Sequence, residues 1–423
     1  MRQVVQPLSG GAVEVLEVPR PSIDGTEVLV RTVASVISSG TERALTSLAQ
    51  SSLLAKARAR PDLVRQVIRK AKAEGVVQAS RAVRSRLESD LPLGYSAAGV
   101  VVEVGRHVSG LVPGQMVATA GAGKANHAEY QAVPGLLCAV VPAGVEAEEA
   151  AFATIASIAL HGLRLAELGP GAKIVVLGLG LVGQLAVRLA QASGLDVAGI
   201  DVAEHPLSLA RGSGALALAE RGSETTDAVL EWSRGRGADA VLVCAASSSS
   251  DLVARTPALA RDRAPVVIVG DVGVHLERTP FYEKELSLRF ARSYGPGRYE
   301  RAYEEWGIDY PAGQVRWTEG RNLEAVLDLL ASRRLAVADL ITHRFPIEKA
   351  PDAYELIERR EEPCVGVVLT YSGADEASAG APVRLRAPAG GGATGVGLVG
   401  AGAFASTVLV PGLKAAGFER FVA

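Results

Sequence analysis

The stretch KIVVLGLGLVGQLAVRLAQASGLDVAGID, residues 173–201, decides the fold. An apolar strand runs into a turn with Gly178, Gly180 and Gly183, a helical pattern follows, and a second strand ends at Asp201. In such a turn the first glycine permits the tight bend, the second lets a pyrophosphate approach the backbone, and the third lets the helix pack closely on the strand. The stretch therefore predicts a βαβ unit that binds a dinucleotide.

The glycine turn also indicates which dinucleotide is bound. Backbone N–H groups at the start of the helix favour phosphate, and a carboxylate at Asp201 can accept hydrogen bonds from ribose hydroxyls while repelling a 2′-phosphate. We therefore predict that NAD(H) is preferred over NADP(H). The alternative is a glycine-rich turn without a ligand. The predicted cofactor-binding residues are Gly178, Leu179, Gly180, Leu181, Val182, Gly183 and Asp201.

The alternation of strands and helices continues beyond this unit. Helices are expected over 204–213 and 251–260, and apolar strands occur in ADAVLVCA and APVVIVGD. Before the turn, residues 146–168 read as one long, largely buried helix, and residues 1–43 read as short strands broken by turns. The pattern predicts an α/β protein in which a β-rich domain precedes a doubly wound parallel sheet.

Two segments interrupt this plan. Residues from about 44 to 90 predict a helical insertion with ten Lys or Arg against four Asp or Glu between 51 and 90. This basic insertion could steer an anionic substrate, or it could be a pair of solvated helices covering an apolar face. Residues 371–395 are poor in large apolar groups and predict a linker. Residues 396–423 read as the truncated first βα unit of a second dinucleotide-binding domain.

Composition excludes several classes of protein. A formal net charge of −2 gives no reason to expect nucleic acid or an anionic membrane as a partner. Three scattered cysteines can build neither a disulfide framework nor a four-cysteine zinc lobe, which fits a cytoplasmic location. No stretch is long and apolar enough for a membrane span.

The order of parts resembles the medium-chain dehydrogenase/reductase family. The resemblance covers about residues 1–370 and rests on GTE at 40–42, LGYSAAGVVVEVG at 93–105, HAEYQAV at 127–133, and GLGLVG with Asp201. It implies a GroES-like domain over 1–150, a Rossmann NAD-binding domain over 151–310 and a return to the first domain over 311–370. It also implies a dehydrogenase that acts on a small-molecule substrate, and a homodimer is typical of the family.

Zinc-dependent members of that family hold their metal at positions that match Ser39, Tyr95 and Thr154 here. These hydroxyl side chains are poor zinc ligands beside thiolate and imidazole, so no metal site is predicted. The resemblance implies that Thr41 serves in proton relay, with Glu42 next to it. Tyr95 and Ser39 are further catalytic candidates, although Tyr95 could instead only fill the volume left by the metal. Lone histidines at 127 and 161 are more often structural than catalytic.

A narrower resemblance points to the biological setting. The insertion, the aromatic string RSYGPGRYERAYEEWGIDYP at 292–311 and the VGLVGAGAFAS segment look like bi-domain oxidoreductases whose second half is Gfo/Idh/MocA-like. The resemblance implies a missing C-terminal oxidoreductase domain in cis and a sugar or sugar-derived substrate. The aromatic string could stack on a sugar ring, or it could be a packed loop. A second hypothesis makes this chain a non-catalytic dinucleotide-binding scaffold or sensor.

Overall fold

The structure is a computed structural model that describes residues 1–8, 10–38, 40, 42, 90–359, 361–372, 396–397, 405–418 and 421–422. The described residues from 1 to 372 cluster into one compact unit, and those from 396 onward belong to a second unit. The predicted insertion, apart from residue 90, and the predicted linker, apart from residues 371 and 372, lie outside the described residues.

The N-terminal part of the first unit is built on antiparallel strands. One sheet has the order β15-β16-β3-β5-β6-β8, with β7 also paired to β3, and a smaller sheet has the order β2-β1-β4. The strands before residue 141 are β1 (Arg2–Pro7), β2 (Glu14–Glu17), β3 (Glu27–Ile37), β4 (Asp90–Pro92), β5 (Ser96–Val104), β6 (Met116–Ala120), β7 (Tyr130–Pro134) and β8 (Cys138–Val140), with a short 3₁₀ turn η1 (Gly135–Leu137) between the last two.

The second sheet is parallel throughout and has the order β11-β10-β9-β12-β13-β14. Numbered along the chain, this is the strand order 3-2-1-4-5-6 of a dinucleotide-binding Rossmann fold. The doubly wound sheet expected from the sequence is therefore present. Its strands are β9 (Lys173–Leu177), β10 (Asp196–Asp201), β11 (Leu216–Ala219), β12 (Ala240–Val243), β13 (Pro265–Ile268) and β14 (Ser287–Phe290).

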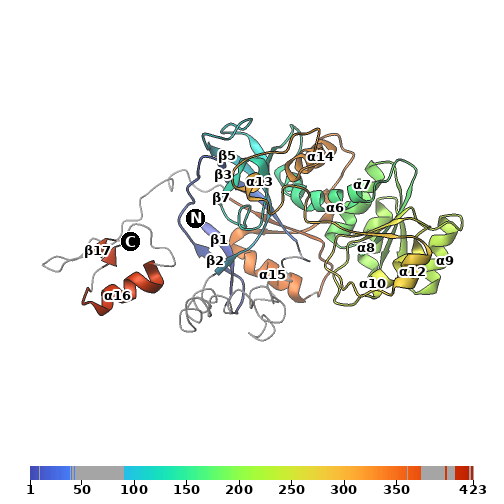
Figure 1. Cartoon of the computed structure of the whole chain (residues 1–423). Helices are drawn as coiled ribbons and strands as arrows, with labels where there is room; N and C mark the ends of the chain where they lie inside the picture. Colours follow the sequence, from blue (N-terminus) through green and yellow to red (C-terminus); the bar gives the residue numbers. More distant parts are fainter. Residues whose placement is uncertain are drawn as a thin grey trace. The chain divides into compact units, whose positions relative to one another are not determined.

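Both faces of the parallel sheet are covered, because successive side chains of a strand point to opposite sides. Ile174 and Val176 join the core under one set of helices, whereas Val175 and Leu177 join the core on the other face. The first set is α6 (Ala153–Leu165), α7 (Leu181–Ala192), α8 (Glu204–Gly212) and α14 (Glu319–Ala331). The second is α9 (Ser223–Trp232), α10 (Asp251–Ala254) and α11 (Thr256–Leu259), and Figure 1 shows α9 and α10 beside the Rossmann strands.

Helix α6 joins the two sheets, since it contacts β5 and β6 of the first and β13 of the second. The single helix predicted over 146–168 is in fact two, α5 (Ala147–Ala150) and α6. Ala151 lies between the two helices, and its carbonyl oxygen accepts a hydrogen bond from the side-chain hydroxyl of Ser96 on β5 at 2.6 Å. A tertiary hydrogen bond thus accompanies an interruption that the helical pattern does not show.

The helix predicted over 251–260 is also divided, into α10 and α11. Pro257 stands in the first turn of α11. Proline has no N–H to donate and its ring clashes with the preceding turn, so it is tolerated at a helix start and not in a helix interior. The sequence contained this signal, and the prediction of one helix was wrong at this point.

After the Rossmann sheet the chain returns to the first sheet. Strand β16 (Gly366–Thr370) runs antiparallel to β3, with Val367 opposite Ile37 and Thr370 opposite Ala34. Besides α14 and β16, the elements of this C-terminal stretch are α13 (Arg301–Glu304), η2 (Ala338–Leu340), β15 (Ile341–Pro346), η3 (Ile347–Lys349) and α15 (Ala350–Arg359). Helix α12 (Arg278–Glu283) lies earlier, between β13 and β14.

The described part of the second unit is a short strand–helix–strand arrangement. Strands β17 (Val396–Gly397) and β18 (Phe421–Val422) pair in parallel, and between them lie a π-helical turn η5 (Ala405–Leu409) and α16 (Val410–Ala415). This agrees in outline with the strand and helix expected there, whereas the likeness to a Gfo/Idh/MocA domain stays a prediction.

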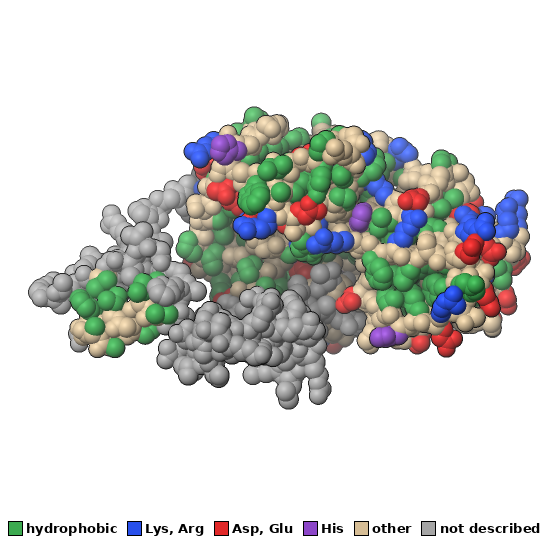
Figure 2. Space-filling view, in the orientation of Figure 1, with side chains coloured by type: hydrophobic (Ala, Val, Ile, Leu, Met, Phe, Trp, Pro, Cys, Tyr) green, Lys and Arg blue, Asp and Glu red, His purple; other side chains and the backbone are tan. Residues whose placement is uncertain are grey.

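Two surface properties bear on the expected partners. On the face drawn in Figure 2, acidic and basic side chains are interspersed, as suits a chain with a formal net charge of −2. Within the described ranges, no helix combines the length and apolar character needed to cross a bilayer.

Candidate active site

The glycine turn lies where β9 meets α7. Gly178 has φ +87°, and a Cβ there would stand 2.6 Å from Cβ of Ala245. A Cβ on Gly183 would stand only 1.9 Å from the carbonyl oxygen of Gly178, whereas one on Gly180 would meet nothing within 4 Å. The first and third glycines are therefore required by packing, and the second leaves open space at the helix N-terminus.

The side chains between these glycines have a different role. Leu179 and Leu181 are fully or almost fully buried in the core, and Val182 packs against it. Leu179 and Leu181 can therefore offer only backbone atoms to a ligand in the turn, whereas Val182 is partly exposed. The unpaired N–H groups of the first turn of α7 remain for a phosphate, and the helix dipole favours negative charge there.

Asp201 lies at the end of β10, next to the turn. One carboxylate oxygen accepts the backbone N–H of Leu179 at 2.7 Å, and the other accepts that of Ala203 at 2.9 Å. A carboxylate offers about four acceptor positions, so two remain for other donors such as ribose hydroxyls. Arg211, the residue that could reach a 2′-phosphate, is paired with Glu204 at 3.2 Å.

The turn lies at a change of direction in the sheet. Strands β9 and β12 are neighbours, but the helix after β9 packs on one face and the helices after β12 pack on the other. Open α/β sheets bind ligands in the crevice outside the carboxyl ends of the strands at such a switch point. Gly178 and Ala245, which follow these two strands, stand together there.

The positions matched to a metal site do not offer metal ligands. Thr154 donates its hydroxyl to the carbonyl oxygen of Thr119 at 3.0 Å, and Tyr95, directly before β5, is 7% exposed and carries a phenol. Ser39 and Thr41 lie outside the described residues. Among the residues that are described, no three His, Cys, Asp or Glu side chains are grouped so that they could hold a metal ion. Because zinc sites are made from thiolate, imidazole and carboxylate ligands, this donor set does not fit zinc.

A buried polar network lies in the GroES-like part. The Nε2 atom of His127 hydrogen-bonds Glu42 at 3.1 Å, and its Nδ1 atom shares a hydrogen bond with the Ser35 hydroxyl at 2.7 Å. The phenol of Tyr354 donates to the same Glu42 oxygen, and Ser35 in turn contacts the phenol of Tyr371 at 2.7 Å. We name these five residues the Glu42–His127 network.

Sequence reasoning found only part of this network. Glu42 and His127 were considered singly, whereas Ser35, Tyr354 and Tyr371 were missed. Tyr354 lies on α15, and Tyr371 directly follows β16, the strand that pairs with β3. The signal for such long-range partners is topological, because no local motif links residue 42 to residue 354. His161, in contrast, is half-buried on α6, and its pKa is lowered by burial and by Arg164.

The aromatic string at 292–311 is packed in part. Tyr294 and Tyr303 are buried, and Tyr303 stacks on Tyr310 with 6.2 Å between ring centroids. The guanidinium groups of Arg292 and Arg298 lie over the ring of Tyr299, at 4.7 and 4.0 Å from its centroid. These contacts support the packing interpretation for Tyr294, Tyr303 and Tyr310. Tyr299 and Trp306 are each 58% exposed, so stacking of these two rings on a sugar stays an open alternative.

Beneath this loop, Glu319 is fully buried without a hydrogen-bond partner for its carboxyl group. The pKa of Glu319 is raised to about 9, mainly by burial and also by the nearby Glu304, with Arg298 opposing the shift. In the unfolded chain the pKa is ordinary, so the native state binds the extra proton and stability falls as the pH rises from about 5 to 9. Each pH unit above the ordinary pKa costs about 1.4 kcal/mol while the carboxyl stays protonated, so Glu319→Gln should stabilise the protein by several kcal/mol at pH 8.5 and have little effect at pH 4.5.

Urea unfolding of both forms at the two pH values would measure this difference. The exposed Glu324→Gln, on the same helix, is the control and should change neither value. An equal effect of Glu319→Gln at both pH values would contradict the assignment of a neutral carboxyl.

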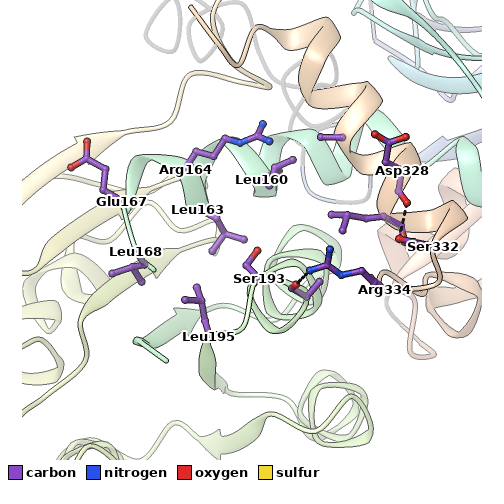
Figure 3. A pocket seen from close by; sticks show the side chains of 13 residues that line it. Leu160, Leu163, Arg164, Glu167, Leu168, Ser193, Leu195, Asp328, Ser332 and Arg334 are labelled. Carbon is purple, nitrogen blue, oxygen red and sulfur yellow. Dashed lines mark hydrogen bonds between the residues drawn. The ribbon is translucent and has the colours of Figure 1, made fainter. Parts of the chain in front are cut away.

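A hollow of about 520 Å³ lies elsewhere, between α6, the end of α7 and α14. Figure 3 shows Arg334 reaching across it to the end of α7, where its guanidinium donates to the carbonyl oxygen of Ala192. None of the predicted site residues lines this hollow. It is therefore separate from the crevice at the glycine turn.

Comparisons with known proteins agree with the fold. Residues 182–306 match the family described as zinc-binding dehydrogenase. The chain is 26% identical over 302 residues to D-xylulose reductase of Saccharomyces cerevisiae, covering 64% of this chain and 78% of that protein. It is 26% identical over 287 residues to D-guloside 3-dehydrogenase of Shigella flexneri, covering 66% and 77%.

Solved structures share the fold. An alcohol dehydrogenase from Thermus sp. ATN1 superposes with a TM-score of 0.65 at 22% identity, over 88% of this chain and all of that one. Galactitol-1-phosphate dehydrogenase from Escherichia coli gives 0.64 at 21% identity over the same shares. The chain therefore shares the fold of medium-chain dehydrogenases, and it is similar in sequence to oxidoreductases of that class. Within that class, its sequence relatives are dehydrogenases and reductases named for polyols and sugars.

Proposed function

We propose that the protein is an NAD(H)-dependent oxidoreductase that interconverts an alcohol and a carbonyl on a sugar or sugar-derived substrate, without zinc. The observation that carries the proposal is the glycine turn at the switch point, with Asp201 hydrogen-bonded to its backbone. Relatives named for xylulose, sorbitol and a guloside support a polyhydroxylated substrate. The hydroxyl side chains at the positions matched to metal ligands support the zinc-free part.

NAD(H) supplies a hydride acceptor or donor when it is bound. The chain's own residues would do the rest: the first turn of α7 binds the pyrophosphate and Asp201 binds ribose hydroxyls. Tyr95 and Thr41 would hold and move the proton of the substrate hydroxyl, since both side chains can donate and accept one. Tyr95 is placed directly before β5, and β5 packs on α6 at the join between the two sheets.

The cofactor preference gives a direct test. We expect calorimetry to show NADH binding more tightly than NADPH by at least about tenfold, or about 1.4 kcal/mol. Asp201→Ala should narrow this difference, because the carboxylate that repels a 2′-phosphate is gone. Asp196→Ala, at the exposed start of the same strand, is the matched control and should leave the preference unchanged. Equal or reversed affinities in the wild type would overturn the role given to Asp201.

A further inference from the structure

The two segments that carry the predicted catalytic hydroxyls are joined by one side-chain pair. Glu42 follows Thr41 in the sequence, and Glu42 accepts the hydrogen bond from His127 and another from the backbone N–H of Ser38 at 3.0 Å. His127 lies directly beneath Gly94, the residue before Tyr95, because a Cβ on Gly94 would stand 2.6 to 2.8 Å from His127 atoms. The same imidazole thus fixes both segments.

The backbone reinforces this join. The N–H of His127 donates to the carbonyl oxygen of Leu93 at 2.7 Å, and Gly94 has φ +94°, a conformation that other residues rarely adopt. The backbone at Gly94 therefore packs directly against the His127 ring. We therefore expect a shift of that ring to disturb the backbone that leads into Tyr95.

The Glu42–His127 network places charged and polar side chains in an apolar part of the protein interior. Glu42 and His127 are both fully buried, and Tyr354 and Tyr371 belong to an apolar cluster with Ile37 and Leu93. Polar groups in such a place cost stability unless each is paired, and a fully paired network favours one arrangement over others. Apolar side chains could fill the same volume without that cost, so packing alone does not account for the set.

We propose that the Glu42–His127 pair positions the catalytic segments against the nicotinamide. The inference rests on the proposed function, because it assigns Thr41 and Tyr95 to the nicotinamide end of the crevice. Glu42 and His127 are positioning residues in this account: they hold the turn after β3 and the backbone before β5 at a fixed separation. Ser35, Tyr354 and Tyr371 complete the hydrogen bonds of the pair and fix its orientation.

The test uses NADH itself as the probe and needs no substrate. Fluorescence titration of the full chain gives two quantities. The dissociation constant of NADH depends on the glycine turn of the Rossmann sheet. The emission of the bound nicotinamide depends on the segments around it. The variant His127→Phe keeps a ring under Gly94 but loses both side-chain hydrogen bonds. His127→Gln keeps a donor for Glu42. Thr225→Val removes a buried hydroxyl with two hydrogen bonds on α9, away from the first sheet, and serves as the control.

We expect His127→Phe to bind NADH within about threefold of wild type, a change of about 0.6 kcal/mol, but to lose at least half of the emission change seen on binding. His127→Gln should retain most of that change, and Thr225→Val all of it. An emission change in His127→Phe equal to that of wild type would overturn the inference, as would NADH binding to wild type without any emission change. Failure of wild type to bind NADH at all would instead overturn the proposed function, and the inference with it.

Discussion

Gly183→Ala should abolish tight binding of the dinucleotide, weakening it by at least about 100-fold, or roughly 3 kcal/mol. The new Cβ would lie 1.9 Å from the carbonyl oxygen of Gly178, and that contact is with backbone that no rotamer change can move. Relief requires α7 to move away from β9. Because the N–H groups of the first turn of α7 form the phosphate site, the same movement removes them from the ligand.

Calorimetry with NADH, together with thermal unfolding, would measure both consequences. Gly180→Ala has open space around its Cβ and should weaken binding without loss of stability. A Cβ on Gly212, at the end of α8, would also meet nothing within 4 Å, so Gly212→Ala should change neither the affinity for NADH nor the thermal stability. Wild-type affinity in Gly183→Ala would show that the dinucleotide binds elsewhere.

Glu42→Ala should destabilise the fold by roughly 3–5 kcal/mol. It leaves His127, the phenol of Tyr354 and the N–H of Ser38 without the acceptor that they share, and all of these groups are buried. Burial and the Glu42 carboxylate raise the pKa of Tyr354 well above its ordinary value, so the phenol stays a donor at neutral pH. An unsatisfied buried donor costs about 1–3 kcal/mol, and three are created together.

Urea unfolding at pH 7 would measure the loss. Glu42→Gln keeps an acceptor oxygen and should cost clearly less, and Glu324→Gln on the exposed face of α14 should cost nothing measurable. A loss below about 1 kcal/mol for Glu42→Ala would show that the network contributes little to stability.

The sequence could predict the Rossmann sheet because its information is local. Residues 173–201 contain the strand, the turn, the helix and the acid in one run, and the structure brings Asp201 to the turn. The pairing of β16 with β3 involves residues more than 300 positions apart, and it was expected only through a family resemblance. Contacts of that kind depend on topology, which residue patterns do not encode locally.

The missed features have the same physical origin. The break between α5 and α6 goes with a hydrogen bond from Ser96, a residue more than 50 positions earlier. The Glu42–His127 network draws its members from β3, from the segment before β7 and from the C-terminal return of the chain. Pro257 is the exception, because its effect on a helix is local and could have been predicted. Ser39 and Thr41 lie outside the described residues, so their predicted catalytic roles stay predictions.

The most direct measurement of the central claim is turnover of the purified protein after removal of metals. Sorbitol and xylitol with NAD, and their ketoses with NADH, would be assayed before and after dialysis against a strong chelator, with bound zinc measured in parallel. We predict turnover with NAD(H) at a rate that neither the chelator nor added zinc changes, with zinc far below one ion per chain. Loss of turnover on chelation, restored by zinc, would contradict the account.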